Sequence, residues 1–598
     1  MGERPGRQPH VIILVVGITV IVACTNVVGK AHADGAAGGA VAVGTARSAA
    51  EATVMKFTTR IEFGEDVGQN FGSLFEVPTR DGRLVIGAGF MGLYNTHFRS
   101  DRYTVQFFIR PTHGEREFAT DHLPRPCDDA GTYLFDLDGK LYSHSHAHDK
   151  TVRWWNEGVR RWEADPSPVY GRMRLGDGML LLGDGQVHYN GNPILTSPEQ
   201  GAYNRFYYAL GHLFFYHTYW AEKSGYRTYE ADSEGFSRLY ACPWTPGGAV
   251  EEGSARSRAQ GSGEGIDLSR AIVETLPVVG ETTFAYGQLG GNVLTCSNIG
   301  GLYLFDGQAW KTLVEPQVGR SYQIYSMLNF YDRLLMGHYP TGLLYEFDGE
   351  KVTLLEGWPP RLAGVAPNAR EAQTTAIYAG DLFVGVWPWG ELWRQGPDTG
   401  QWYSVGRMFT HPPVTDETTH PYEKECVAHE LVANQWGQRV TSLVPSGDSL
   451  MVSTSAKWPC EWEPRFDFLP DGKWQEYGSV MRLRTPGNLC ASVRRTQAAT
   501  ELQFILNETE MRIMQDGEEL ASAKMDAGRG AGGGKRLATG DAGLAAEVAK
   551  AARLEQVAWG CGVFGLFAGA TLDGKAETRT TPPSARERSL PAATAPPE

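Results

Sequence analysis

The chain has 598 residues, enough for one large domain or for two to four ordinary ones. Aromatic residues make up 11% of it, and it contains 72 Gly and 33 Pro, a mixture of strand formers and turn formers that indicates a β-rich protein. The formal net charge of −14 argues against a general nucleic-acid binder. A local basic cleft remains compatible with this charge, because charges more than about 10 Å apart are screened at ~0.1 M salt.

The first residues predict export. Arginines precede an apolar run of 14 residues, VIILVVGITVIVAC, which ends at Cys24. That run is shorter than the roughly 20 residues that a spanning helix needs, and it fits a secretory leader over residues 1–33. Two alternatives for processing of this leader remain. IVAC resembles a bacterial lipoprotein box that would place a lipid on Cys24, whereas Ala31-His32-Ala33 offers an ordinary cleavage site. We expect a secreted, periplasmic or lipid-anchored surface protein.

A repeated hairpin organises the rest of the chain. GNVLTCSNIGGLYLFDG (291–307) and DRLLMGHYPTGLLYEFDG (332–349) align on their shared FDG, which places Cys296 opposite His338. Related hairpins occur at 82–94, 139–144, 211–217, 380–393 and 447–453, with a weaker one at 176–190. Four short strands per unit, repeated every 40–80 residues, predict an all-β protein, a β-propeller with four antiparallel strands per blade. Seven blades are favoured, and eight remain open.

The predicted domains follow from these patterns. An Ala/Gly-rich linker over 34–54 leads into a propeller over 55–525. Residues 526–574 form an extension that contains a helical pattern at 542–556 and is a candidate source of a closing strand. The Pro/Thr/Ala-rich tail over 575–598 is expected to be disordered.

Four residues suited to proton transfer and anion binding are predicted to share one face of three successive blades. His122 precedes the blade of GKLYSHSHAHD, His144 ends the second strand of that blade, Tyr189 follows a second strand in the next, and Arg205 enters the third. His146 and His148 follow His144 at a period of two and share its side of the strand. Structural roles for single residues of these types remain the alternative. No G-x-S-x-G, H-E-x-x-H, P-loop or Rossmann motif is present.

The segments YSHSHAHD, VHYNGN, YNRFYYALGHLFFYH and SYQIYSMLNFYDRLLMGHYPTGLLYEFDG resemble the seven-bladed β-propeller ulvan lyases, enzymes that cut an algal sulfated polysaccharide. The resemblance spans roughly residues 60–500 and implies β-elimination at a uronic acid. It implies that Arg205 neutralises the carboxylate and that Tyr189 protonates the departing oxygen, or acts as base for the other epimer. One of His122 and His144 would be the base, with His122 favoured.

The same resemblance implies that His146, His188 and Tyr208 contact the substrate, an acidic sulfated polysaccharide. It implies a monomer without an organic cofactor or a nucleic-acid partner. A structural zinc held by Cys242, Cys296 and His338 is also implied, and buried cysteines acting as small apolar residues are an equal alternative. The competing function is a non-catalytic surface propeller that binds a glycan or a protein partner.

Overall fold

The computed structural model describes residues 55–61, 72–78, 82–91, 104–145, 151–166, 172–175, 178–183, 185–220, 227–230, 234–246, 265–289, 291–318, 323–330, 333–339, 341–358, 360, 370–413, 436–456, 472–494, 500–506, 510–524 and 567–572. The predicted leader, linker, helix at 542–556 and C-terminal tail lie outside these residues. So do His146 and His148.

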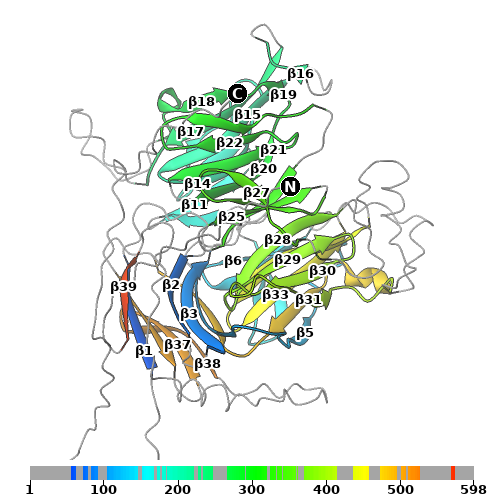
Figure 1. The fold of residues 1–598 in the computed structure, drawn as a ribbon. Helices are drawn as coiled ribbons and strands as arrows, with labels where there is room; N and C mark the ends of the chain where they lie inside the picture. The colour runs from blue at the N-terminus through cyan, green and yellow to red at the C-terminus, as the bar shows by residue number, and fades with distance from the viewer. Residues whose placement is uncertain are drawn as a thin grey trace, which may run out of the picture.

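The described residues are almost entirely β-structure, which confirms the prediction of an all-β propeller (Figure 1). Their helical content is two short 3-10 turns, η1 (Leu268–Arg270) and η3 (Lys473–Glu476). No helix in this part of the chain is long and apolar enough to span a bilayer.

Seven four-stranded antiparallel sheets within the described ranges have the strand order of propeller blades. Given from the innermost strand outward, the first three are β6 (Thr132–Leu137), β7 (Lys140–Ser145), β8 (Val152–Asn156) and β9 (Arg161–Asp165); β10 (Arg172–Leu175), β11 (Gly178–Gly183), β12 (Gln186–Tyr189) and β13 (Asn192–Leu195); and β14 (Ala202–Ala209), β15 (His212–Trp220), β17 (Gly235–Pro243) and β18 (Ile272–Thr275). A small ribbon of β16 (Arg227–Thr228) and β19 (Val278–Val279) accompanies the third.

The remaining four blades follow the same scheme. They are β20 (Thr283–Leu289), β21 (Asn292–Ser297), β22 (Leu302–Phe305) and β23 (Trp310–Val314); β24 (Gln323–Phe330), β25 (Arg333–Tyr339), β26 (Leu344–Phe347) and β27 (Val352–Leu354); β28 (Glu371–Tyr378), β29 (Asp381–Trp387), β30 (Glu391–Gln395) and β31 (Trp402–Arg407); and β32 (Gln438–Ser446), β33 (Ser449–Ala456), β34 (Val480–Arg484) and β5 (Ala119–Leu123).

Contacts between neighbouring sheets join these blades in a closed cycle. The innermost strands β14, β20, β24, β28 and β32 contact one another in that order, and β32 contacts β6. Met179 on β11 packs against the aromatic cluster of β6 and β7, and one hydrophobic core is shared by the β10–β13 sheet and the β14–β18 sheet. The last blade therefore lies beside the first.

The ring is closed by a strand from the start of the propeller. β5 pairs with β34 over Ala119–Leu123 and Val480–Arg484, although more than 350 residues separate the two in the chain. Leu123 is buried in the largest hydrophobic core with Met481 and Leu483. The outer edge of the last blade is thus supplied by the segment that leads into the first.

The repeated G-x-L pattern is explained by the turns between first and second strands. Asp138-Gly139, Leu210-Gly211 and Ala379-Gly380 form two-residue turns with positive φ at both positions. Such turns match the twist of antiparallel strands and favour Gly. We call the face that carries these turns the bottom face, and the face where the innermost strands begin the top face.

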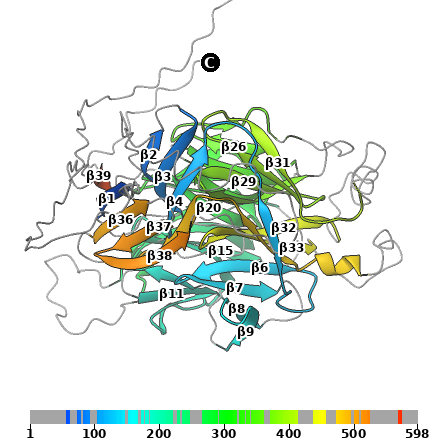
Figure 2. The same ribbon diagram turned by 90° about the horizontal axis from the view of Figure 1, so that it is seen from below.

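A β-sandwich formed by both ends of the described chain packs against the bottom face. One sheet contains β2 (Gly72–Pro78), β3 (Leu84–Met91), β4 (Thr104–Pro111) and β35 (Asn488–Ser492). The other contains β38 (Glu518–Lys524), β37 (Glu510–Gln515), β36 (Thr500–Leu506), β1 (Met55–Ile61) and β39 (Phe567–Leu572). Figures 1 and 2 show these N-terminal blue strands beside the C-terminal orange ones.

Aromatic packing joins the two sheets of the sandwich. Phe57 stacks on Phe75 with ring centroids 4.4 Å apart, and Phe504 meets Phe75 at 5.6 Å. Below the blades, the Gln106 side-chain amide donates to the Ile377 carbonyl at 2.7 Å. A Cβ at Gly380 would lie 2.6 Å from Phe108, so this close approach requires glycine.

The sandwich changes the predicted domain boundaries. The hairpin at 82–94 was expected to be a blade, but its described residues lie in the sandwich sheet with β4 and β35. Strands after Asn488 also leave the propeller. β39 falls in the extension that was a candidate for closing the propeller, yet it pairs with β1 in the sandwich. The local hairpin pattern is the same in both settings, because each needs a tight turn between two apolar strands.

We predict that Leu123→Ala destabilises the protein by about 2–5 kcal/mol, because it opens a cavity where β5 closes the ring. Urea unfolding measures the change. Thr120→Ala, at an exposed position on the same strand, should change the free energy of unfolding by less than about 0.5 kcal/mol. Equal effects of the two substitutions would contradict a closing role for Leu123.

Candidate functional site

Five side chains on innermost strands form what we call the axial cluster: Tyr133, Arg205, Tyr325, Glu371 and Arg439. The Arg439 guanidinium lies 4.0 Å from the Glu371 carboxylate and donates to the Tyr133 hydroxyl at 3.4 Å. The charges of Glu371, Arg439 and Arg205 all act on the phenol of Tyr325. All five residues lie near the start of their strands and therefore on the top face.

A repeated β-bulge places two of these side chains. The pairing register shifts between Asn204 and Tyr207 around Arg205, and between Ile324 and Ser326 around Tyr325. A bulge breaks the strict alternation of a strand and redirects a side chain, and bulges are common beside active sites. Arg205 also has a positive φ of 58°, which is uncommon for a residue other than glycine. Both side chains are half-buried.

Burial and charge set the protonation state of Tyr325. Burial raises the pKa of this phenol well above its ordinary value, and nearby Glu371 and Tyr339 raise it further. Arg439 and Arg205 act in the opposite direction. The phenol pKa remains raised, so Tyr325 is a neutral hydrogen-bond donor at physiological pH.

His144 lies next to the axial cluster, as the sequence frame predicted for its strand end. It is half-buried near the end of β7, directly opposite Tyr133 in the register. Directly opposed residues of antiparallel strands project on the same side of the sheet, with Cβ atoms about 5 Å apart. His144 therefore shares a side with the tyrosine that Arg439 contacts.

Tyr189 and Tyr208 do not join this cluster. Tyr189 ends β12, the third strand of its blade, so it lies at the bottom face rather than on the expected top face. Its hydroxyl donates to the Leu175 carbonyl at 2.9 Å. Tyr208 is fully buried and donates to the Trp244 carbonyl at 3.0 Å. The sequence analysis assigned β12 as the second strand of its blade. Neighbouring strands run in opposite directions, so a second strand ends at the top face and a third strand ends at the bottom face.

His122 and His188 lie elsewhere on the propeller. His122 is exposed on β5, the outermost strand of the last blade, and it lines a cleft at the rim. Three strand spacings of ~4.8 Å separate β5 from the innermost strand, roughly 14 Å. His188 is half-buried on β12, beside Tyr189. The four residues expected to be catalytic are therefore not one constellation: Arg205 and His144 lie on the top face near the axis, Tyr189 below and His122 outside.

The residues considered as zinc ligands lie in different surroundings. Cys242 belongs to the core of the β14–β18 blade and Cys296 to the core between β20–β23 and β24–β27. Burial raises the pKa of each thiol to about 12, which disfavours the thiolate that binds metal. His338 is buried, with its Nδ1 2.7 Å from the Thr341 hydroxyl. The described residues contain no group of three or more His, Cys, Asp or Glu that could hold a metal ion. These three residues do not fit a shared zinc site, and nothing below depends on zinc.

Four residues of the axial cluster were missed by sequence reasoning: Tyr133, Tyr325, Glu371 and Arg439. Tyr325, Glu371 and Arg439 lie in SYQIY, EAQTT and QRVTS, at the start of each innermost strand. The repeat was aligned on the turn between the first two strands and on the second strand. The second strand ends on the top face, where the innermost strand begins. Extending the alignment one strand backward, to the polar residues before each apolar run, would have found them.

A buried carboxyl group occupies the top of the β20 blade. Glu281 is fully buried, accepts a hydrogen bond from the Tyr303 hydroxyl at 2.7 Å and accepts another from the Val278 amide at 3.2 Å. Burial raises the pKa of this carboxyl group above its ordinary value, and hydrogen bonds with Ser297 and Tyr303 oppose the shift. The folded state therefore holds the Glu281 proton more tightly than the unfolded chain does.

Comparisons with known proteins leave the family open. No family model matches the chain, and no curated protein matches it. Among solved structures, the computationally designed Ika8 protein is 10% identical with a TM-score of 0.30, and the match covers 71% of this chain and 99% of that one. YCF48 bound to D1 peptide is 11% identical with a TM-score of 0.32, covering 62% of this chain and 96% of that one. At these scores the propeller fold rests on the strand pairing itself.

We predict that Tyr189→Phe lowers the free energy of unfolding by about 0.5–1.5 kcal/mol, because the Leu175 carbonyl loses its hydrogen bond. Urea unfolding measures the loss. The ring fills the same volume in both variants, so the core should remain packed. An unchanged stability would contradict a structural role for this hydroxyl.

We also predict that Glu281 makes stability fall as the pH rises. Above pH ~4.5 the unfolded chain releases this proton while the folded chain keeps it, so the free energy of unfolding declines until the folded group ionises. Glu281→Gln should remove this decline in urea unfolding between pH 4 and pH 7. Glu199→Gln, at an exposed carboxylate on another blade, is the matched control and should retain it. A wild-type slope in Glu281→Gln would contradict the assignment.

Proposed function

We propose that this protein is a polysaccharide lyase that cleaves an acidic glycan by β-elimination at a uronic acid, using the axial cluster. The base removes the C5 proton, the C4–O4 bond breaks, and an acid protonates O4, which leaves a C4=C5 unsaturated uronate. The reaction needs a cation at the carboxylate, a base and an acid. The axial cluster and the adjacent His144 include one residue type for each part.

The observation that carries the proposal is the placement of Arg205 and Tyr325 in matching β-bulges on two innermost strands at the top face. Arg205 sits in a bulge with unusual backbone geometry and acts on the phenol of Tyr325 from a different blade. Arg439 already has a carboxylate nearby in Glu371. We assign Arg205 to the substrate carboxylate, because a β-bulge places it on an innermost strand near the start of that strand at the top face.

The remaining roles follow from protonation state and register. Tyr325 keeps its proton because its pKa is raised, so we assign it as the acid that protonates the leaving oxygen. His144 lies opposite Tyr133 at the edge of the cluster, and we assign it as the base. Tyr325 thereby takes the part that the resemblance implied for Tyr189, and His144 takes the part favoured for His122.

The finer substrate assignment comes from the resemblance. Ulvan, a sulfated glycan that contains uronate, is the substrate that the resemblance implies, and export to the cell surface or medium would bring the enzyme to such a polymer. Neither a cofactor nor a metal is required for the three roles assigned here.

A binding propeller without catalysis is the second candidate. Arg439 contacts both Glu371 and Tyr133, and each of the three residues is at most 5% exposed. Buried networks of this kind often serve to specify a structure. On this reading, the top face would hold a glycan through Arg205 and Tyr325 without breaking it.

We predict that the protein raises the ultraviolet absorbance of unsaturated uronate when ulvan is added. Arg205→Ala should lower kcat/KM about 10²–10³-fold, since it removes charge stabilisation of the transition state. Tyr325→Phe should lower kcat about 10²–10⁴-fold, since it removes the acid.

Tyr189→Phe is the matched control for Tyr325→Phe, because it removes a hydroxyl that is bonded to Leu175 at the bottom face. It should retain turnover. Full activity in both Arg205→Ala and Tyr325→Phe would refute the assigned mechanism. Binding of ulvan without any new absorbance would favour the binding propeller.

A further inference from the structure

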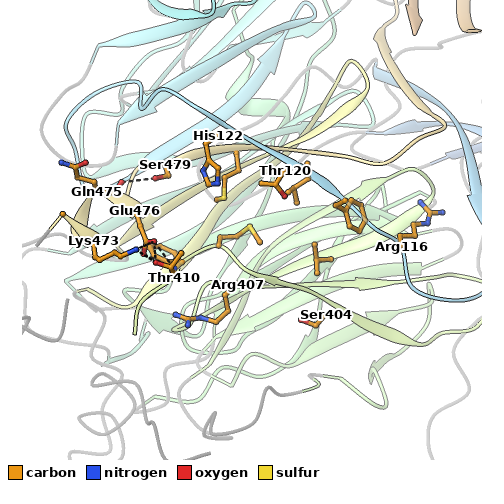
Figure 3. Close-up of a pocket in the computed structure, with 17 residues that line it drawn as sticks. Arg116, Thr120, His122, Ser404, Arg407, Thr410, Lys473, Gln475, Glu476 and Ser479 are labelled. Carbon is orange, nitrogen blue, oxygen red and sulfur yellow. Dashed lines mark hydrogen bonds and ion pairs between the residues drawn. The ribbon is translucent and has the colours of Figure 1, made fainter. Parts of the chain in front are cut away.

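A cleft of about 660 Å³ opens at the rim of the propeller between its last two blades (Figure 3). Its walls come from β5, β31, β34 and the segments 408–410 and 472–479. We call it the rim cleft. Its volume lies within the range of about 300–1,000 Å³ that is usual for small-ligand sites. The assigned roles in β-elimination make no use of it.

Cationic side chains dominate the charged lining of the rim cleft. Arg116, Arg407 and Lys473 line it, together with the imidazole of His122, against a single carboxylate, Glu476. That carboxylate is already engaged by the protein. It accepts hydrogen bonds from the Thr410 amide at 3.1 Å and the Thr410 hydroxyl at 2.6 Å, and it lies 3.6 Å from the Lys473 ammonium.

Within the described residues, the groups that accept hydrogen bonds from the Arg407 guanidinium are all neutral. Its guanidinium donates to the Trp389 carbonyl at 3.0 Å, the Pro412 carbonyl at 2.6 Å and the Gln438 side-chain oxygen at 2.8 Å. Burial lowers the pKa of Arg407 to about 10, so it stays protonated at neutral pH. The three bonds fix its position and leave its charge uncompensated by a contacting carboxylate.

Arg116 adds a second buried cation at one end of the cleft (Figure 3). Its side chain is 3% exposed, and its Nε lies 3.3 Å from Asp381. Asp381 also pairs with Arg394 at 2.8 Å, so two guanidinium groups share one carboxylate. Nη1 and Nη2 of Arg116 have no hydrogen-bond partner among the described residues. The Arg116 guanidinium lies at the far end of the cleft from Lys473, beside Asp381, so it contributes positive charge at that end rather than a donor aimed at the centre of the cleft (Figure 3).

We propose that the rim cleft binds a short acidic oligosaccharide through its carboxylate or sulfate groups, as a glycan site separate from the axial cluster. The cations of the cleft attract an anion, although the chain as a whole is strongly negative. Hydroxyl and amide groups that suit sugar hydroxyls also line the cleft, on Thr120, Ser404, Gln475 and Ser479. The half-buried Phe118 offers apolar surface for the C–H face of a sugar ring.

This inference rests on the proposed function for the class of ligand, an acidic glycan. The rim lies about 14 Å outward from the innermost strand of the same blade, a span of three strand spacings. A chain of several sugar units covers that span, so one polymer can occupy both the rim cleft and the axial cluster. The rim cleft would then raise the local concentration of substrate.

Calorimetric titration of the full chain with a sulfated, uronate-containing tetrasaccharide tests the proposal. It is done in the Arg205→Ala background, which removes turnover. We expect binding that weakens as salt rises, since surface charges are screened. His122→Gln and Lys473→Gln together should weaken it at least tenfold, and Lys311→Gln, an exposed lysine on another blade, should leave it unchanged. An uncharged tetrasaccharide should not bind.

The outcomes separate this proposal from the proposed function. Unchanged affinity in His122→Gln with Lys473→Gln overturns the rim cleft as a glycan site, whatever the turnover of the wild-type protein. Equal or tighter binding of a Glu-rich peptide overturns the ligand class in favour of an acidic peptide. Binding that is lost with the cleft variants, while wild-type turnover is also absent, supports the rim cleft and refutes the lyase.

Discussion

The pairing of β5 with β34 is the interaction on which the rest of the propeller depends. A blade that ends in an unpaired edge leaves backbone groups exposed, and a ring of blades can then splay open. Here the outer strand of the last blade comes from residues just before the first, so the two ends hold each other. The strands that carry Tyr133, Tyr325 and Arg439 keep their places around the axis because this ring is closed.

The β-sandwich below the ring is also built by pairing strands from the two ends of the described chain. N-terminal strands pair with C-terminal ones three times, β4 with β35 and β1 with both β36 and β39. Arg110, with contacts to Asp398 and Glu76, lies between the sandwich and the β28 blade. Buried ion pairs add little net stability but penalise misplacement, so they fix how the two parts sit together. The sandwich packs against the bottom face of the ring. The two candidate sites lie on the top face and at the rim.

Both candidate sites must bind an acidic ligand on a chain of negative net charge, and their cations are held in place differently. A chain with a net charge of −14 repels polyanions at long range, so an acidic ligand must be held by local cations at short range. In the axial cluster Glu371 lies near Arg439, and Arg205 comes from a distant strand. At the rim, the hydrogen-bond acceptors of Arg407 are all neutral, and the charges of Glu391 and Glu476 act on it without a contact.

The sequence by itself determined the all-β class, the repeated hairpin and the top-face positions of His144 and Arg205, because turn chemistry and strand alternation are local. Gly139 and Gly380 mark turns that any antiparallel hairpin with this twist would need. Only the tertiary structure decided that 82–94 belongs to a sandwich, that His122 lies at the rim and that Tyr189 lies below. It also brought Tyr325, Glu371 and Arg439 together. These outcomes depend on which edge each strand joins, and that choice is made by segments hundreds of residues apart.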